Sequence, residues 1–474
     1  MQKRVEQAVS TPSLRQPAVL LFSEFLAALT QALEGEGLRP CVLRNYEGFP
    51  GVNVGGDIDF LISRSDLPCA MHALRSVKGV RIVGYCWHPH VASVFVEGIC
   101  ATPGGRSFQV DFFLSLSWKG LPYLSVDAVL QASQPRQAGN IHFFVPSPVH
   151  EAIISLLTSL IIGGRIKEKY FPQVQRRFAD NRCEVIAALL PQFGVKAVTR
   201  LVDSVIGGDR QKIHACVRSL RTCLALRSLL CKPIRSACSI VRHYAGEGEV
   251  RYSPRTIETV CILGPSGCGK TTIIENLIPL LQSSAKIVEK HHFKSRLTLA
   301  RKSRRMNSRS DGCAQAQSGS LSSMAKALVW LLDEWLSQFI GKKNFTLRIC
   351  GCSCQDLLID PAKYGYNGPQ WFARLASRFF PSPDLWILLD PAMRTEGGEL
   401  PAQTARQIEA YRSFVKARKQ HIILNAGKPA ADLTEDVYAA IIDMLAQSTD
   451  RQLKRRFCAL DAAVGDEERA GCRE

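Results

Sequence analysis

A glycine-rich loop in the second half of the chain has the residue types needed to hold a phosphate group. An apolar run from Val260 to Leu263 leads into the pattern G-x-x-x-x-G-K-T, and an apolar helical pattern follows. Glycines let backbone N–H groups surround a phosphate, the helix points its positive end at it, and a lysine and a threonine add an ammonium group and an Mg²⁺ ligand. We expect a nucleotide-binding loop made by Gly264, Pro265, Ser266, Gly267, Cys268, Gly269, Lys270, Thr271 and Thr272.

Three aspartates in the first half of the chain could form a second chemical centre. Asp57 and Asp59 are two positions apart in an apolar run that predicts a strand, so both side chains point to the same face. A second strand, predicted from Phe108 to Leu114, can bring Asp111 alongside them. Carboxylate oxygens are the ligands that Mg²⁺ prefers, so these three residues and Thr271 are the candidate metal ligands.

Both patterns also have simpler explanations. A glycine-rich turn can arise by chance, but the complete motif lies between a strand and a helix, where a phosphate loop is expected. Alternating acids are common on surface strands, but two glycines precede Asp57 and a third acid follows on a later strand. That arrangement is typical of the nucleotidyltransferase fold, in which Mg²⁺ activates the attacking hydroxyl and stabilises the leaving pyrophosphate.

Length and charge limit the kinds of protein that this can be. A chain of 474 residues is too long for a single core and predicts two or three domains. The formal charge of +18 indicates an anionic partner, and no strong nucleic-acid motif accompanies it. The excess lies at 210–242, where either a solvated helix face or membrane-surface docking is an explanation, and at 286–309, which could gather phosphate.

The apolar and cysteine patterns favour a cytoplasmic protein. The longest apolar run, Val149 to Ile162, has the length of a buried helix, and the N-terminus lacks the pattern of a secretory signal. The seventeen cysteines are scattered and odd in number, which indicates reduced, buried thiols. Cys350, Cys352 and Cys354 alone are clustered; they could hold a metal, but a buried strand end is the favoured interpretation.

Strands and helices predict an α/β protein in several parts. The first is an α+β unit, followed by helices with breaks at Gly163-Gly164, Pro172 and Pro191 that could place Tyr170 on an inner face. The last large part alternates strands, two of them expected at 385–390 and 421–425, with helices, the last expected at 432–445. This alternation indicates a parallel sheet with helices on both faces. The predicted domains are 1–145 (nucleotidyltransferase-like), 146–206 (helical cap), 207–256 (basic helical connector), 257–448 (P-loop kinase-like) and 449–474 (polar tail).

Two stretches carry a family resemblance. Leu43-Arg-Asn-Tyr-Glu-Gly-Phe-Pro50 and Gly56-Asp-Ile-Asp-Phe-Leu-Ile62 resemble bacterial nucleotidyltransferase-like proteins found with surface-polysaccharide genes, over roughly the first 170 residues. The second half, about 256–446, resembles thymidylate kinase, and more closely the kinase-like domain that follows the transferase domain in those proteins. Its matching words include Asp356-Leu-Leu-Ile-Asp-Pro361 and Pro383-Asp-Leu-Trp-Ile-Leu-Leu-Asp390. The resemblance implies ATP and Mg²⁺ as cofactors and a lid-like role for Arg394. Phe293 and Arg296 could serve the acceptor nucleotide, and Asp390 is expected to have a structural role at the end of its strand.

The chain departs from the kinase pattern at one place. Where these kinases carry Asp-Arg-Tyr at the end of the third strand, alignment back from Asp356 places Gly351, Cys352 and Ser353. Neither glycine nor cysteine offers a fixed charge to phosphate or Mg²⁺. The donor half of the kinase site is therefore expected to be intact and the acceptor half damaged.

Three hypotheses follow. The first is phosphotransfer from ATP on the loop, in which Lys270 and Arg394 are catalytic and Asp356 or Asp360 replaces the missing acid. The second is an ATP-binding regulatory or assembly module. The third is nucleotidyl transfer to a sugar or phosphorylated small molecule at Asp57, Asp59 and Asp111. The favoured prediction is an ATP-binding kinase-like domain fused to a nucleotidyltransferase-like domain.

Overall fold

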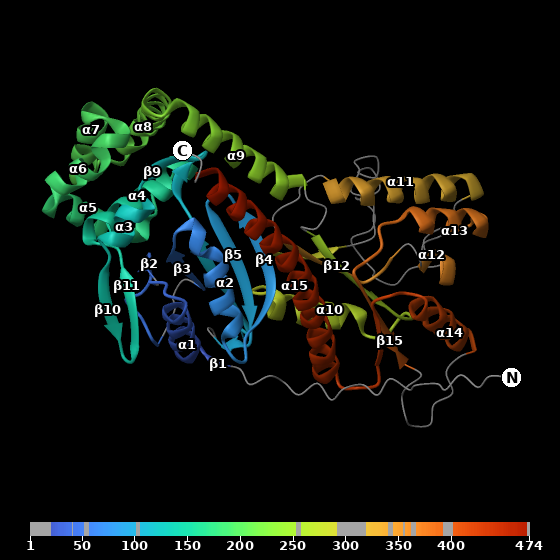
Figure 1. Cartoon of the computed structure of the whole chain (residues 1–474). Coiled ribbons are helices and arrows are strands. Elements are labelled where there is room, and N and C mark those ends of the chain that lie inside the picture. The colour runs from blue at the N-terminus through green and yellow to red at the C-terminus, as the bar shows by residue number, and fades with distance from the viewer. Residues whose placement is uncertain are drawn as a thin grey trace.

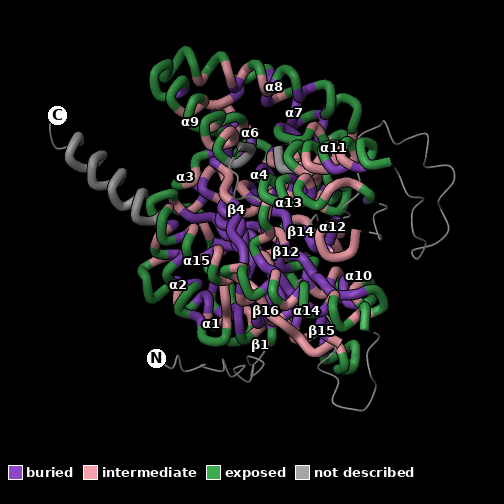
Figure 2. Tube along the Cα trace, turned by 90° about the vertical axis from the view of Figure 1, so that its right-hand side faces the viewer, coloured by how far each residue is buried: buried purple, intermediate pink, exposed green. Residues whose placement is uncertain are grey.

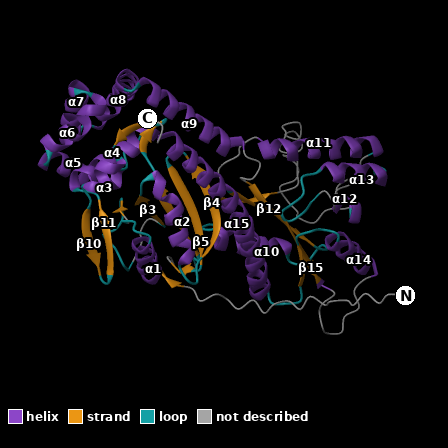
Figure 3. Cartoon of the chain, viewed as in Figure 1, coloured by secondary structure: helices purple, strands orange, loops and turns teal. Residues whose placement is uncertain are grey.

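The protein has a mixed α/β fold with two main sheets, as predicted. The computed structural model describes residues 20–39, 41–51, 56–100, 105–252, 257–291, 319–339, 345–353, 356–361, 366–391 and 402–471. Figure 1 shows the chain running from one sheet, through a group of helices, to the second sheet, and Figure 3 shows the helices around both sheets. No helix in the described ranges has the length and apolar character needed to cross a bilayer.

The first sheet is mixed and has seven strands. Its order is β10 (Gln134–Ala138), β11 (Ile141–Val145), β2 (Cys41–Val42), β3 (Asp57–Leu61), β7 (Ser107–Phe113), β5 (Val91–Glu97) and β4 (Arg81–His88). Helices α1 (Phe22–Gly35) and α2 (Leu67–Ser76) pack with the residues of one face, including Phe60 and Phe112, in a buried core. Because side chains alternate along a strand, Asp57, Asp59 and Asp111 belong to the opposite face.

Smaller elements border this sheet. They are the parallel pair β1 (Leu20–Leu21) and β6 (Ile99–Cys100), the 3₁₀ turn η1 (Arg64–Asp66), the hairpin β8 (Leu116–Trp118) and β9 (Leu121–Leu124), and the short helix α3 (Val126–Gln131). The side-chain hydroxyl of Ser125 caps α3 by accepting from the Ala128 N–H, a common way to satisfy a helix N-terminus.

The middle of the chain is helical, as predicted. It contains α4 (Pro148–Gly163), η2 (Glu168–Tyr170), α5 (Phe171–Asp180), α6 (Arg182–Phe193), α7 (Val195–Ile206), α8 (Arg210–Cys231) and α9 (Pro233–Tyr252). Gly164 ends α4 and Pro172 begins α5 as expected, but Pro191 lies inside α6 instead of ending it. The predicted basic connector, 207–256, does not begin as a separate segment. Its first helix, α8, buries Ile213, Leu220 and Leu224 in the core formed with α4 to α7.

The second sheet has five parallel strands. Its order is β13 (Ile287–His291), β14 (Thr346–Cys350), β12 (Ile257–Leu263), β15 (Leu385–Asp390) and β16 (His421–Asn425). Helices α10 (Lys270–Leu281) and α15 (Ala430–Gly471) share a core with one face, and α14 (Ala402–Lys416) shares a core with the other. A further cluster joins α11 (Ser320–Phe339), α12 (Asp356–Ile359) and α13 (Gln370–Phe379). The expectation of helices on both faces is met.

The last helix is longer than the sequence indicated. Helix α15 was expected to span only 432–445 and to precede a polar tail, but it continues to Gly471. Leu453 is fully buried in the core of the first sheet, and Arg81 pairs with Asp443 at 2.5 Å. A polar stretch can continue a helix when one face meets another part of the protein, so the extension is explained by packing instead of local pattern.

The two sheets meet in a shared core. Val83, Cys86 and Phe95 of the first sheet pack with residues of β12, β14 and α10. The Phe345 ring stacks on Phe95 with centroids 5.4 Å apart, and a Cβ added at Gly84 would lie 2.2 Å from the same ring. Figure 2 shows buried positions continuing from β4 to β12. The aspartate-bearing face of the first sheet is therefore partly covered by the second half.

Candidate functional site

The three predicted aspartates converge. Strands β3 and β7 are parallel neighbours with Asp59 opposite Asp111, while Asp57 stands two pairs earlier on β3, opposite Gln109. One carboxylate oxygen from each residue lies within 4.8 Å of the others. A separation of this size can be spanned by one or two hard cations after small side-chain rotations. The sequence prediction of a shared carboxylate face is thus confirmed as geometry.

Asp59 is the most enclosed member of the group. Its side chain is 1% exposed; one oxygen pairs with Arg44 Nε, and the other, Oδ1, is buried and has no hydrogen-bond partner among the described residues. Leaving a buried carboxylate oxygen unsatisfied costs free energy comparable to a lost hydrogen bond, or more for a charged group. A cation at this position would offset that cost, so the residues present fit Mg²⁺.

The electrostatics of the other two aspartates reflect this crowding. Burial raises the pKa of Asp111 to about 6, against hydrogen bonds from Gln109 and Ser93 that lower it. Burial and then the charge of Asp59 raise the pKa of Asp57, while Arg44, Lys167 and Lys286 oppose them. A cation bound between these carboxylates would reduce the repulsion between their negative charges.

A group of basic and amide side chains borders the carboxylates. Asn45 accepts hydrogen bonds from Tyr170 Oη at 2.8 Å and Lys169 Nζ at 3.1 Å. Burial and the charge of Arg44 lower the pKa of Lys167, against Asp57 and Asp59. Tyr170 therefore lies on the inner face of the helical region, as expected. The sequence predicted no role for four of these residues: Arg44, Asn45, Lys167 and Lys169. Arg44 and Asn45 were noted only as part of the stretch that carries the family resemblance.

The glycine-rich loop also has the predicted form. Strand β12 ends at Leu263, the loop follows, and α10 begins at Lys270 with Gly269 as its N-cap. Gly267 and Gly269 have φ angles of +82° and +86°, which side-chain-bearing residues rarely adopt. Ser266, Gly267, Gly269, Thr271 and Thr272 are exposed at the start of the helix. These backbone N–H groups are available to an anion at a helix N-terminus.

Lys270 folds back across the loop. Its Nζ donates to the carbonyl oxygens of Gly264 and Pro265, each at 2.7 Å, and lies 3.6 Å from Cys268 Sγ. A Cβ added at Gly264 would lie 2.8 Å from the Leu389 carbonyl oxygen, so only glycine fits where the loop passes β15. The lysine ammonium is thereby held beside the loop, where a phosphate-binding lysine is needed.

The two centres are separate but joined by α10. The loop lies at the start of this helix, which is about 18 Å long at 1.5 Å per residue. Beyond its other end, the fully buried Ser284 hydroxyl lies 2.6 Å from the Ser107 hydroxyl of β7. The positive charge of Lys286, two residues later, lowers the pKa of Asp57. The candidate residues therefore form two sites, with the end of α10 against the carboxylate-bearing sheet.

The remaining kinase-like residues are accounted for only in part. Arg394, Phe293 and Arg296 lie outside the described residues, as does Cys354. Asp356 is buried and accepts from Tyr411 Oη at 2.8 Å and from the Ser353 N–H at 3.3 Å, which favours a structural role over a replacement acid. Asp390, expected to be structural, is fully buried and accepts from Arg412 Nε at 2.6 Å.

The cysteine cluster behaves as a strand end. Cys350 is the last residue of β14 and is buried, and burial raises the pKa of its thiol well above the usual range. Cys352 is partly exposed. Among the described residues, the groups with metal-ligand spacing include neither of these thiols. The interpretation as a buried strand end is therefore favoured for the described part of the cluster.

Comparison with known proteins found no matching family model and no matching curated protein.

Proposed function

We propose that the first half of the chain is a Mg²⁺-dependent nucleotidyltransferase and that the second half is a kinase-like domain that binds ATP on residues 264–272. The finer fold assignments belong to this proposal. A D-x-D strand beside a parallel strand with a third aspartate supports a nucleotidyltransferase-like domain. A five-stranded parallel sheet with its phosphate loop after the central strand supports a P-loop kinase-like domain. The acceptor class is a sugar or a phosphorylated small molecule, as in surface-polysaccharide synthesis.

The observation that carries the proposal is the convergence of Asp57, Asp59 and Asp111 with a buried, unpartnered oxygen on Asp59. Bound Mg²⁺ supplies activation of the attacking hydroxyl and charge neutralisation at the leaving pyrophosphate. Asp57 and Asp59 would hold it from one strand. Asp111, opposite Asp59 on the neighbouring strand, would complete the carboxylate set around the cation.

The surrounding side chains suit a triphosphate. Arg44 and Lys167 bring positive charge to the carboxylate group, and Lys169 is held beside it by Asn45. Positive groups that approach the metal from the side of the helical region can balance the phosphate charges left after Mg²⁺ binds. The hydrogen bond from Tyr170 to Asn45 fixes this border between the sheet and the helices.

Pyrophosphate release tests this function. The full chain is incubated with each nucleoside triphosphate, Mg²⁺ and a panel of sugar phosphates, and the wild type is compared with Asp59→Asn and with Asp66→Asn, a partly exposed acid in η1. We expect metal-dependent release that falls at least 100-fold in Asp59→Asn and is unchanged in Asp66→Asn. Equal release by Asp59→Asn and the wild type would reject the assignment.

Phosphoryl transfer at the loop is the second candidate. Lys270 and the glycine geometry favour it, whereas Gly351 and Cys352 provide no acid or guanidinium. Labelled ATP with a panel of nucleoside monophosphates separates the possibilities. Transfer to any acceptor, lost in Lys270→Ala, supports a kinase. Tight ATP binding without transfer supports a regulatory or assembly module instead.

The turn between α8 and α9 suits contact with a membrane surface. Leu230 and Ile234 are each 79% exposed and Val241 is 67% exposed, among Arg227, Lys232 and other basic residues. Exposed apolar side chains within a basic helical segment are typical of binding to anionic lipid. Sedimentation with phosphatidylserine vesicles should capture the wild type, and Leu230→Asp with Ile234→Asp should reduce capture at least fivefold. Equal capture would reject this contact.

A further inference from the structure

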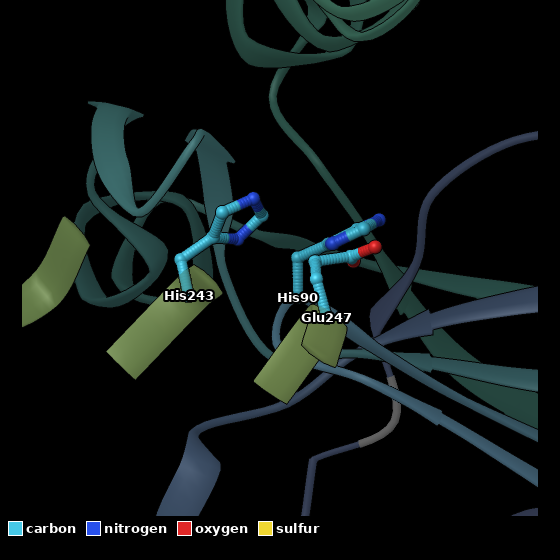
Figure 4. A group of neighbouring side chains, drawn as sticks. All are labelled: His90, His243 and Glu247. Atoms are coloured by element: carbon cyan, nitrogen blue, oxygen red, sulfur yellow. The ribbon is translucent and has the colours of Figure 1, made fainter. Parts of the chain in front are cut away.

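A second group of side chains with metal-ligand spacing shares no residue with the two centres described above. It contains His90, in the turn between β4 and β5, with His243 and Glu247 of α9. One ligand atom from each residue lies within 4.8 Å of the others. Figure 4 shows the two imidazole rings and the carboxylate brought together from the turn and the helix. His243 and Glu247 are four positions apart, which places them on one face of α9.

The backbone brings these elements unusually close. A Cβ added at Gly246 would lie 2.7 Å from Pro89 Cγ, so the turn fits against the helix because position 246 has no side chain. Arg64 donates to the Pro89 carbonyl oxygen and holds the turn from its other side. Pro89 and Gly246 are direct chain neighbours of His90 and Glu247. The contact that positions the turn therefore also positions the candidate ligands.

The hydrogen bonds around the group leave a nitrogen available. His243 Nδ1 is buried and meets no hydrogen-bond partner in the part of the chain that the structure describes. His88 Nδ1 lies 3.2 Å from Glu247 Oε1 and orients that carboxylate, as groups behind metal ligands commonly do.

We propose that His90, His243 and Glu247 form a Zn²⁺ site that fastens α9 to the β4–β5 turn. Two imidazoles and one carboxylate are a common zinc ligand set, and they leave a fourth tetrahedral position for water. Zinc–ligand bonds of 2.0–2.2 Å require the ligand atoms to be about 3.4 Å apart. Small side-chain rotations that move these atoms by roughly 1 Å would bring them to that spacing. The site is independent of the nucleotide chemistry proposed above.

Cobalt titration tests the site. Tag-free, full-length protein is stripped with a chelator and titrated with Co²⁺, whose visible spectrum reports tetrahedral ligation and whose thiolate bands would reveal cysteine binding. We expect one tetrahedral Co²⁺ per chain with no thiolate band, displaced by Zn²⁺; Co²⁺ at the three aspartates would lack the intense tetrahedral bands. Affinity should fall at least tenfold in His243→Ala and in Glu247→Gln, which keeps the side-chain shape, and should be unchanged in His214→Ala, an exposed histidine of α8.

A second measurement covers variants that fold poorly. Zn²⁺ should raise the unfolding midpoint of the wild type and of His214→Ala, because a ligand that binds the folded state stabilises it. It should leave Glu247→Gln within 1 °C of its metal-free midpoint. Cobalt bound only through thiolate, or affinity in His243→Ala and Glu247→Gln within twofold of the wild type, would overturn the proposal.

Discussion

Asp59 is held on one carboxylate oxygen and left open on the other. Arg44 fixes the first oxygen, and no donor of the described chain reaches the buried second one. A carboxylate retained only for stability gains nothing from that arrangement, because an unsatisfied buried oxygen opposes folding. The side chain is more simply understood as a metal ligand whose orientation is set by Arg44 and which has a carboxylate oxygen within 4.8 Å of those of Asp57 and Asp111.

Lys270 gives a direct test of the phosphate loop. Replacing Lys270 by Ala should weaken ATP binding at least tenfold, about 1.4 kcal/mol, because the ammonium that faces the loop is removed while its backbone remains. Isothermal titration calorimetry measures the affinity. Lys290→Ala is the matched control, since this lysine pairs at 3.4 Å with Glu275 of α10 and is not part of the loop. Unchanged affinity in Lys270→Ala would remove the basis for a nucleotide site in the second half.

The residues with local signals were the predictable part of the site. Spacing on one strand placed Asp57 beside Asp59, and the motif itself placed Lys270 after its loop. Arg44, Lys167 and Lys169 had no such signal, because their contribution depends on how the helical region folds back over the sheet. Lys169 reaches Asn45 across 124 positions of the chain. Sequence spacing carries no information about a contact of that kind.

At the scale of elements, strand β12 contains near its start a buried acid, Glu258, whose ionised form is destabilised in the folded protein. Burial and the nearby Asp384 raise the pKa of Glu258 to about 7, and Ser448 of α15 donates to it at 2.6 Å. The folded state therefore binds this proton more tightly than the unfolded chain does. Its contribution to stability is present below about pH 4.5 and is lost as pH rises through about 7.

The free energy of unfolding should consequently fall between pH 5 and pH 8, by up to about 3 kcal/mol. Glu258→Gln mimics the protonated acid and should flatten this dependence. Urea unfolding followed by circular dichroism at several pH values measures it. Glu275→Gln, which changes an exposed acid of α10, should keep the wild-type slope. If the unfolding free energies of Glu258→Gln and the wild type changed equally with pH, Glu258 would not be the source of this pH dependence.

Element prediction succeeded where the pattern is local. The strands Leu385–Asp390 and His421–Asn425 stand where buried apolar runs between turns predicted them. Helix α15 was underestimated because its later turns are sparse in apolar residues. Those turns are anchored by Leu453 and by the pair Arg75–Asp450, both of which depend on the first sheet. When a helix is stabilised by residues far away in the chain, its length cannot be predicted from its own sequence.

At the scale of the whole molecule, the two halves share one core. Phe345 is 4% exposed and stacks on Phe95, while α15 reaches both sheets. Phe345→Ala should therefore destabilise the protein by about 3–5 kcal/mol. Its effect should extend to both halves, because the ring is shared between them.

Hydrogen exchange followed by mass spectrometry measures that coupling. In Phe345→Ala, peptides of β4–β5 and of β12–β14 should both exchange faster than in the wild type. Phe379→Ala, which alters a side chain that is 58% exposed, should leave both nearly unchanged. Faster exchange confined to β14 would show that the halves unfold independently.

Divalent-cation binding by Asp57, Asp59 and Asp111 is what the proposed transferase function requires first. Electron paramagnetic resonance of Mn²⁺ titrated into the full chain, with Mg²⁺ as competitor, measures this directly. We predict Mn²⁺ binding that Mg²⁺ displaces, that is weakened at least tenfold in Asp59→Asn and that is retained in Asp66→Asn. Mn²⁺ binding in Asp59→Asn equal to that of the wild type would contradict the carboxylate centre and the transferase function built on it.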